Sequence, residues 1–146
     1  VGAYRMKRPV PEVIYLDTSA LIALFNRNDK NHERAVSYLR EALESGNLFL
    51  LSRPVLMEYL NGLSKRYGKE IAKENYDALT SSSFVYIENE TEADWRKAWE
   101  FFFKYRDQRG IDLFDSLSFA IMERLGLKTA FTFDSDFEVH GFRTVP

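Results

Sequence analysis

Short apolar runs alternate along this chain with longer segments in which apolar residues recur at helical spacing. The short runs are rich in β-branched and aromatic residues, which favours strands over helices. Because strands that alternate with helices are joined by right-handed crossovers, this order favours a mostly parallel sheet. The sequence therefore predicts an α/β fold with a central sheet of about four or five strands flanked by helices. We expect the strands at residues 13–16, 48–51, 84–87, 129–133 and 142–145.

Capping residues and glycines mark the ends of the intervening helices. Ser52 and Pro54 open one helix with a capping hydroxyl and an early proline, and residues 91–94 resemble a capping box at the start of another. Gly46 and Gly126 suit the left-handed position just beyond a helix. The predicted helices cover residues 19–25, 32–45, 52–67, 69–79, 91–108 and 112–125.

The composition is that of one globular domain. A length of 146 residues is enough to bury a single core, and 45% hydrophobic residues is ordinary for such a domain. The absence of cysteine excludes disulfides, thiolate zinc sites and cysteine nucleophiles, so we expect a cytoplasmic protein. No run approaches the roughly 18 apolar residues that a membrane span needs. We expect the domain over residues 13–146, after an N-terminal extension of residues 1–12 in which Met6 could be the natural start, preceded by an added tail.

Four acidic residues occupy positions that can face one rim of the predicted sheet. Asp17 and Asp134 directly follow apolar strands, and Glu58 and Asp115 lie early in helices. In open α/β sheets, ligands bind beyond the carboxyl ends of the strands. Carboxylates gathered there repel one another unless a divalent cation occupies the site. Oxygen ligands favour Mg²⁺ or Mn²⁺, and such an ion supports phosphodiester hydrolysis.

Each of these acids also has an ordinary structural explanation. Asp17 could cap the helix that follows it, and a glutamate such as Glu58 is favoured early in a helix by the dipole. Asp112 could cap the last long helix, with Asp115 completing a capping box. Asp134 could belong to a turn. The convergence of all four acids on one rim favours the metal site.

The acids lie in four segments that resemble the successive motifs of PIN domains. The segments are IYLDTSAL at 14–21, PVLME at 54–58, DSLSFA at 115–120 and FTFDSDF at 131–137, in that order along the chain. The resemblance covers residues 13–145 and is closest to the stand-alone PIN proteins that include the VapC toxins of toxin–antitoxin pairs. It implies a single PIN-like domain.

By this resemblance the chain is expected to be a metal-dependent endoribonuclease that hydrolyses phosphodiester bonds of single-stranded or structured RNA, and to be the toxin of a toxin–antitoxin pair. The resemblance assigns catalysis and the binding of Mg²⁺ or Mn²⁺ to four acids, of which the first and third are the principal ligands: Asp17, Glu58, Asp115 and Asp134. It assigns supporting roles to three hydroxyls and one further acid, namely Thr18, Ser19, Thr132 and Asp136.

The resemblance also implies partners: an RNA substrate, an antitoxin whose segment crosses the active-site groove, and a second copy in a homodimer. A formal net charge of −2 requires any RNA contact to be local, and Arg53 and Arg109 are the expected RNA-binding residues because they adjoin the acidic motifs. Residues 101–103 are all phenylalanine, and they cannot share one helix face because consecutive residues are about 100° apart. That helix is expected to meet a loop, a second subunit or a peptide, or to be buried on two sides.

Other acidic α/β folds fit less well. A haloacid-dehalogenase-like phosphatase needs an aspartate two positions after the first, where this chain has Ser19. A receiver domain expects paired acids after its first strand and a lysine after its last. The glycine motifs of P-loop and dinucleotide-binding folds are absent. The main alternative is a catalytically weak PIN-like scaffold that binds RNA or a protein partner.

Overall fold

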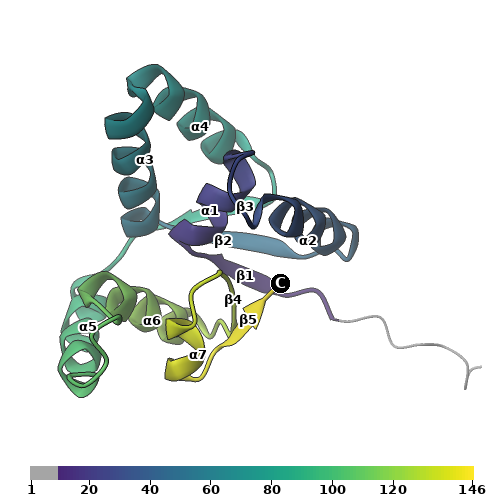
Figure 1. Ribbon diagram of the computed structural model, residues 1–146. Helices are drawn as coiled ribbons and strands as arrows, with labels where there is room; N and C mark the ends of the chain where they lie inside the picture. The colour runs from purple at the N-terminus through teal and green to yellow at the C-terminus, as the bar shows by residue number, and fades with distance from the viewer. Residues whose placement is uncertain (1–9) are drawn as a thin grey trace, which may run out of the picture.

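The computed structural model describes residues 10–146, which form a five-stranded sheet with helices on both faces (Figure 1). Most of the extension expected at residues 1–12 lies outside the described residues. The strands are β1 (Val13–Leu16), β2 (Leu48–Ser52), β3 (Val85–Glu88), β4 (Thr129–Phe131) and β5 (Arg143–Val145). The helices are α1 (Thr18–Phe25), α2 (His32–Glu44), α3 (Arg53–Tyr67), α4 (Lys69–Ser81), α5 (Glu92–Lys104), α6 (Leu113–Leu125) and α7 (Asp136–His140). None of these helices has both the length and the apolar character needed to cross a membrane.

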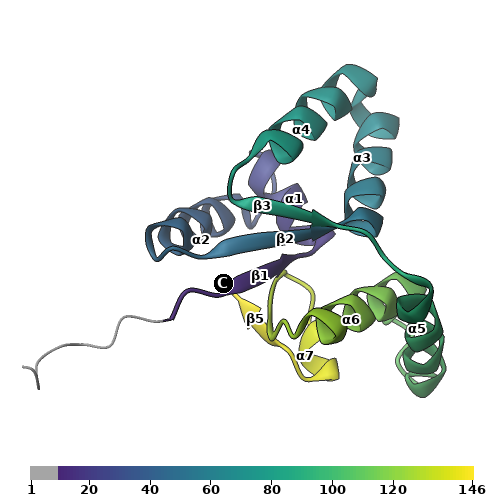
Figure 2. The same ribbon diagram turned by 180° about the vertical axis from the view of Figure 1, so that it is seen from behind.

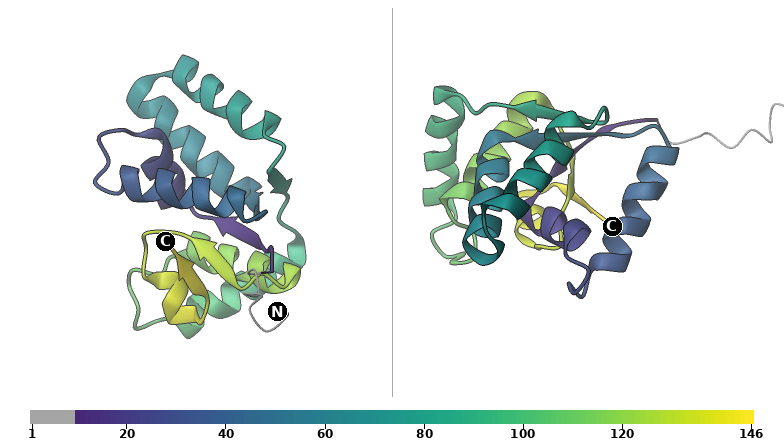
Figure 3. Two further views of the ribbon diagram at one scale, coloured as in Figure 1. Left: turned by 90° about the vertical axis from the view of Figure 1, so that its right-hand side faces the viewer. Right: turned by 90° about the horizontal axis from the view of Figure 1, so that it is seen from above.

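All five strands are parallel and lie in the order β3-β2-β1-β4-β5, which puts β1 at the centre. The chain winds outward from β1 to β3 and then returns past β1 to add β4 and β5. Because crossovers between parallel strands are right-handed, the two halves place their helices on opposite faces. Helices α1 to α4 cover one face and α5 to α7 the other (Figures 1 and 2), with α2 and α5 at opposite ends of the molecule (Figure 3). The predicted α/β class and parallel sheet are confirmed.

The central strand is buried on both sides. Ile14 and Tyr15 are fully buried and Leu16 nearly so, because helices cover both faces of the sheet. Phe49 of β2 and Phe131 of β4 are also fully buried, and their ring centroids lie 6.2 Å apart. Each large apolar side chain buried in this way stabilises the fold by roughly 1.5–3 kcal/mol. This packed centre fixes where β1 ends, and therefore where Asp17 lies.

Several element bounds shift by one or two residues from the sequence-based expectation, and three differences are larger. Strand β4 ends at Phe131 rather than at residue 133, because the backbone N–H groups of Phe133 and Asp134 donate to side-chain hydroxyls and not to a neighbouring strand. Helix α5 ends at Lys104 rather than near residue 108. Beyond it the backbone forms turns, in which the Gln108 N–H donates to the Tyr105 carbonyl oxygen at 2.8 Å. The short helix α7 has too few residues to show a helical period in the sequence.

The aromatic helix α5 divides its large side chains between two faces. Phe101 is buried, whereas Trp99 and Phe103 are 45% and 58% exposed. The rings of Trp99 and Phe103 stack with centroids 5.8 Å apart, and Phe102 packs edge-on against both. The prediction that residues 101–103 cannot share one face is confirmed, and one aromatic face of α5 is open at the surface.

Candidate active site

Asp17 lies where the central strand ends and α1 begins. Its backbone N–H donates to the carbonyl oxygen of Phe131 at 3.1 Å, which extends the pairing of β1 with β4. Asp17 occupies the N-cap position of α1, but its side chain makes no capping hydrogen bond. Instead, its Oδ2 accepts from the hydroxyls of Ser19 and Thr132, each at 2.8 Å. The carboxylate is therefore held at the rim of the sheet and does not serve as a helix cap.

Two hydroxyls connect Asp17 to the segment that carries Asp134. Ser19 Oγ and Thr132 Oγ1 lie 3.2 Å apart. Ser19 Oγ accepts from the backbone N–H of Phe133, and Thr132 Oγ1 accepts from that of Asp134, both at 3.0 Å. Because Thr132 directly follows β4, these bonds fix the loop after β4 against the end of β1.

Glu58 reaches the same rim from the second turn of α3. The Thr18 hydroxyl donates to Glu58 Oε1 at 2.5 Å, and the Glu58 side chain is otherwise exposed. A cavity of about 20 Å³ lies beside it, lined by three of the four acids, Asp17, Glu58 and Asp115, together with residues of α1, α3 and α6. Since one water molecule needs roughly 10–15 Å³ by a comparable measure, this cavity has room for one group of that size.

Asp115 lies in the first turn of α6 and shares a capping box with Asp112. Asp112 Oδ1 accepts from the Asp115 N–H at 2.8 Å, and Asp115 Oδ2 accepts from the Asp112 N–H at 3.0 Å. Asp112 therefore caps the helix, as the sequence indicated. The box uses only one oxygen of Asp115, so this residue can complete a cap and also offer a ligand.

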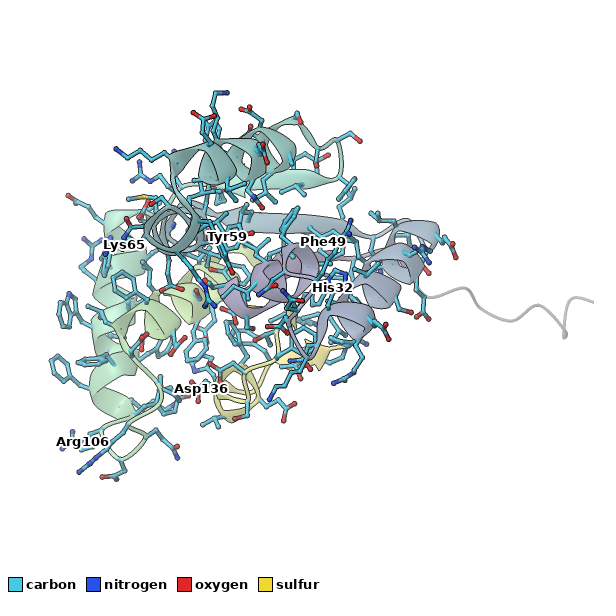
Figure 4. All side chains as sticks on the ribbon, turned by 45° about the horizontal axis from the view of Figure 1, so that its top comes forward. His32, Phe49, Tyr59, Lys65, Arg106 and Asp136 are labelled. Carbon is cyan, nitrogen blue, oxygen red and sulfur yellow. The ribbon has the colours of Figure 1, made fainter. Side chains whose placement is uncertain are left out.

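Asp134 and Asp136 lie in the turn between β4 and α7, and Figure 4 labels Asp136 at the start of α7. Asp134 Oδ1 accepts from the Asp136 N–H at 3.0 Å. Asp115, Asp134 and Asp136 each offer a carboxylate oxygen, and the three oxygens lie within 4.8 Å of one another. Asp136, expected only in a supporting role, thus belongs to the most compact trio of acids. Asp17 and Glu58 meet Asp115 at the small cavity instead.

The pKa values of three acids at this rim, Asp17, Asp115 and Asp136, are raised. Burial is the largest cause for Asp115, whose pKa rises to about 8, and the negative charges of neighbouring acids add to it. Burial likewise raises the pKa of Asp136 to about 6, with the charge of Asp134 as the next cause. Burial also raises the pKa of Asp17. Among the described residues, none of the five acids belongs to an ion pair that would offset these shifts.

Known proteins with a similar sequence point to one family. A family model for the PIN domain matches residues 14–142. The chain belongs to the PIN-domain family. The 23S rRNA-specific endonuclease VapC20 of Mycobacterium tuberculosis is 32% identical to this PIN domain over 130 residues, which cover 89% of this chain and 95% of VapC20.

Solved structures share the fold of this PIN domain. The crystal structure of VapC20 from Mycobacterium tuberculosis, described as a sarcin–ricin loop cleaving toxin, has a TM-score of 0.73 and 30% identity, and the match covers 88% of this chain and 95% of that one. VapBC2 from Rickettsia felis, bound to a DNA fragment from its promoter, has a TM-score of 0.68 and 21% identity over 90% and 96% of the two chains. The second likeness shows the fold alone. The PIN-like fold predicted from the motifs is confirmed.

In this PIN domain, each of the four motif acids has one oxygen held by the protein. The held atoms are Asp17 Oδ2, Glu58 Oε1, Asp115 Oδ2 and Asp134 Oδ1. The second oxygen of each acid receives no side-chain donor from the described residues. Such pre-oriented carboxylates form a donor set that suits a divalent cation, because hard cations prefer oxygen ligands.

The two arginines expected to contact RNA lie in different surroundings. Arg53 pairs with Glu90 at 2.7 Å, which partly neutralises its charge. Arg109 is exposed and directly precedes Gly110, where an added Cβ would lie 3.5 Å from Asp136 Oδ1. The backbone around Arg109 therefore lies beside the acidic trio, and Arg109 is the better placed of the two for a contact with substrate there.

The sequence analysis did not identify Tyr15, Ser52 and Ser118, whose hydroxyls form a hydrogen-bonded group beside the site. The buried Tyr15 hydroxyl lies 2.8 Å from Ser52 Oγ and donates to Ser118 Oγ at 2.7 Å, which links β1, β2 and α6. Ser118 and the half-exposed Phe114 line the small cavity. A tyrosine in an apolar strand and a serine in an apolar helix were the available signals, but either is also common in an ordinary core.

Proposed function

We propose that this PIN domain is a metal-dependent endoribonuclease that acts as the toxin of a toxin–antitoxin pair. The proposal depends above all on five carboxylates that gather at one rim of the sheet with no cationic partner among the described residues. The likeness to VapC20, which spans nearly all of both chains, supports RNA as the substrate. Because VapC20 is specific for 23S rRNA and cleaves its sarcin–ricin loop, we propose looped ribosomal RNA as the substrate class.

The residues at the rim fit a divalent cation. Asp115, Asp134 and Asp136 would hold it, with Asp17 and Glu58 as further ligands around the small cavity. We propose Mg²⁺ or Mn²⁺, because every donor is an oxygen and because a cation would offset the repulsion between these neighbouring carboxylates. When bound, such an ion supplies a Lewis acid that stabilises charge on a phosphoryl oxygen and lowers the pKa of water.

The chain itself holds the acids in place. Hydroxyls fix Asp17 and Glu58, and the capping box fixes Asp115, so the carboxylates need little rearrangement to bind a cation. Neither histidine nor cysteine lines the small cavity. Because a cation held by the acids would lower the pKa of bound water, we expect water to be the attacking group.

The decisive experiment is cleavage of an RNA that contains the sarcin–ricin loop, with Mg²⁺, Mn²⁺ or a chelator, by the native protein and by Asp17→Asn. We expect cleavage only with a metal, and a loss of about 100-fold or more in the variant, which keeps an oxygen for the Ser19 and Thr132 hydroxyls. Asp77→Asn, at an exposed acid on α4, is the matched control and should cleave normally. Metal-independent RNA binding without cleavage would favour the scaffold instead.

As a toxin, the protein requires a partner that blocks its site, and we propose an antitoxin encoded beside it and a cytoplasmic location. The open aromatic face of α5, formed by Trp99, Phe102 and Phe103, supports a homodimer. Co-expression with the product of a neighbouring short reading frame, followed by cleavage assays and measurement of mass in solution, tests both ideas. A monomer whose activity no neighbouring product inhibits would contradict them.

A further inference from the structure

A pocket of about 590 Å³ opens between α1, α3 and α4, on the face of the sheet that these helices cover. Its volume lies within the roughly 300–1,000 Å³ that is typical of sites for small molecules. Thr18 and Glu58 line both this pocket and the small cavity at the acidic rim, so the two adjoin. We call it the side pocket. In Figure 1 the α3–α4 hairpin projects from the sheet beside α1. The residues that line the side pocket belong to these three helices and to the loop after α1.

The walls of the side pocket are apolar and partly aromatic. Tyr59 is buried at the base, on the side of α3 that faces α1 (Figure 4), with its ring centroid 6.1 Å from that of Phe25. The side chains of Phe25, Tyr67 and Ile71 are 45%, 50% and 38% exposed. Large apolar groups exposed together around a concave surface indicate a binding site, and flat rings are suited to a stacked planar group.

The charge of the side pocket favours a polyanion. Arg27 and Arg66 line it, and Glu58 at the acidic rim is the only acid among its lining residues. Neither arginine belongs to an ion pair among the described residues. The Arg66 guanidinium lies 5.4 Å from the centre of the Tyr67 ring, an arrangement in which it can also stack on a base. Aromatic walls beside unpaired arginines are the features that proteins use to hold unstacked nucleotides.

Gly62 keeps the wall formed by α3 open. It lies inside the helix, and a Cβ added there would meet no atom within 4 Å. Neither close packing nor backbone conformation therefore requires glycine at this position, and helix propensity disfavours it. The space that it leaves belongs to the side pocket.

We propose that the side pocket receives an unstacked base of the RNA, from a nucleotide near the phosphate that lies at the acidic rim. Arg27 and Arg66 contact the adjoining phosphates, and the rings of Phe25 and Tyr67 flank the base. This inference depends on the proposed ribonuclease function for the position of the phosphate. It extends that function by assigning the residues that choose where the RNA is cut.

The test measures binding without cleavage, in the full chain carrying Asp17→Asn. The probes are single-stranded oligoribonucleotides, each with one 2-aminopurine whose fluorescence is quenched on stacking, and matched oligonucleotides with an abasic site at the same position. Gly62→Phe fills the side pocket, and Gly62→Ala is the control that changes the same helix position but adds only one methyl group. Thermal unfolding of both variants checks that the fold is retained.

We expect Gly62→Phe to weaken binding by about 10-fold and to abolish quenching at one position of the probe, as expected for the loss of one base–aromatic stack. An abasic site at that position should weaken binding to the Gly62→Ala protein similarly but add nothing to Gly62→Phe. Equal affinity of the two variants for every probe would overturn the proposal. So would a Gly62→Phe protein that binds RNA normally but no longer binds an antitoxin, because the side pocket would then hold a peptide.

The two proposals fail in different ways. If the native protein cleaves no RNA with any metal, the ribonuclease function fails, yet position-specific quenching lost in Gly62→Phe would still support a base in the side pocket. If cleavage depends on Asp17 but Gly62→Phe binds and cleaves every oligonucleotide as the Gly62→Ala protein does, the ribonuclease function stands and the base pocket is wrong.

Discussion

Asp94 and Asp115 occupy the same position in the same local motif, yet their pKa values shift in opposite directions. Each is the third residue of its helix, α5 or α6, and each completes a capping box. Burial acts to raise the pKa of both. The pKa of Asp94 is nevertheless lowered, because Arg124 Nε donates to its Oδ1 at 2.8 Å and Arg124 Nη2 to its Oδ2 at 3.0 Å. Asp115 has only acids as charged neighbours, and its pKa rises to about 8.

The difference distinguishes an acid that stabilises the fold from one that is proposed to bind a metal. Asp94 already has its cation within the fold and stabilises the packing of α5 on α6. Asp115 lacks one, so its charge must be compensated from outside, by a proton or by a metal ion.

Replacing Asp115 with Asn should remove activity and spare the fold. The Asn side-chain oxygen can still accept from the Asp112 N–H, so the capping box is kept, whereas the negative charge needed for a metal is lost. We expect RNA cleavage to fall by about 100-fold or more, with no loss of thermal stability. A variant that cleaves at the native rate would remove Asp115 from the site.

Replacing Arg124 with Met should have the reverse effect. It leaves Asp94 buried without its partner, which should lower the free energy of unfolding by about 2 kcal/mol after allowance for the partial exposure of Arg124. Cleavage under conditions where the variant is folded should be unchanged. Urea unfolding measures the loss, and Arg96→Met, at an exposed arginine of α5, is the control. Equal stability of the two variants would show that the pair contributes nothing.

Addition of Mn²⁺ should stabilise the native protein. At a metal concentration ten times the Kd, binding to the folded state alone adds about 1.4 kcal/mol. We expect the thermal midpoint to rise in the native protein and in Arg124→Met but not in Asp115→Asn. A similar rise in all three would place the metal away from Asp115.

The contributions of Asp94 and Asp115 to the stability of the fold should change with pH in opposite directions. With a chelator present, the raised pKa of Asp115 stabilises the fold below its ordinary value of 3.8, and this contribution is lost as the pH rises towards 8. The lowered pKa of Asp94 stabilises the fold above 3.8, and this contribution is lost as the pH falls through the lowered value. Thermal midpoints from pH 3 to 8 test both signs, and Asp115→Asn should flatten the slope between pH 5 and 8. An unchanged slope would assign it to other groups.

Much of the fold follows from local patterns. The apolar run at β1, the capping residues of α3 and α5 and the glycine after α6 each act through neighbours in sequence, so these elements and the mostly parallel sheet were predictable. Short elements were harder to predict, since α7 has only five residues and shows no helical period.

The contacts of single side chains could not be predicted from local patterns, as His140 shows. It had no partner in sequence, yet its ring nitrogens lie 2.6 Å from the Tyr105 hydroxyl and 2.9 Å from Glu123 Oε1.

Apolar periodicity shows which acids follow strands and begin helices, and the alternation of strands with helices assigns those acids to one end of a parallel sheet. Which of the acids meet depends on the tertiary structure. It brought Thr132 to Asp17 across 115 positions and placed Asp136 in the trio with Asp115 and Asp134. It also gave Asp94 a cation and Asp115 none, although the local motif is the same. The physical reason is that a capping box is made within four residues, whereas the charge around a buried carboxylate is set by residues distant in the chain.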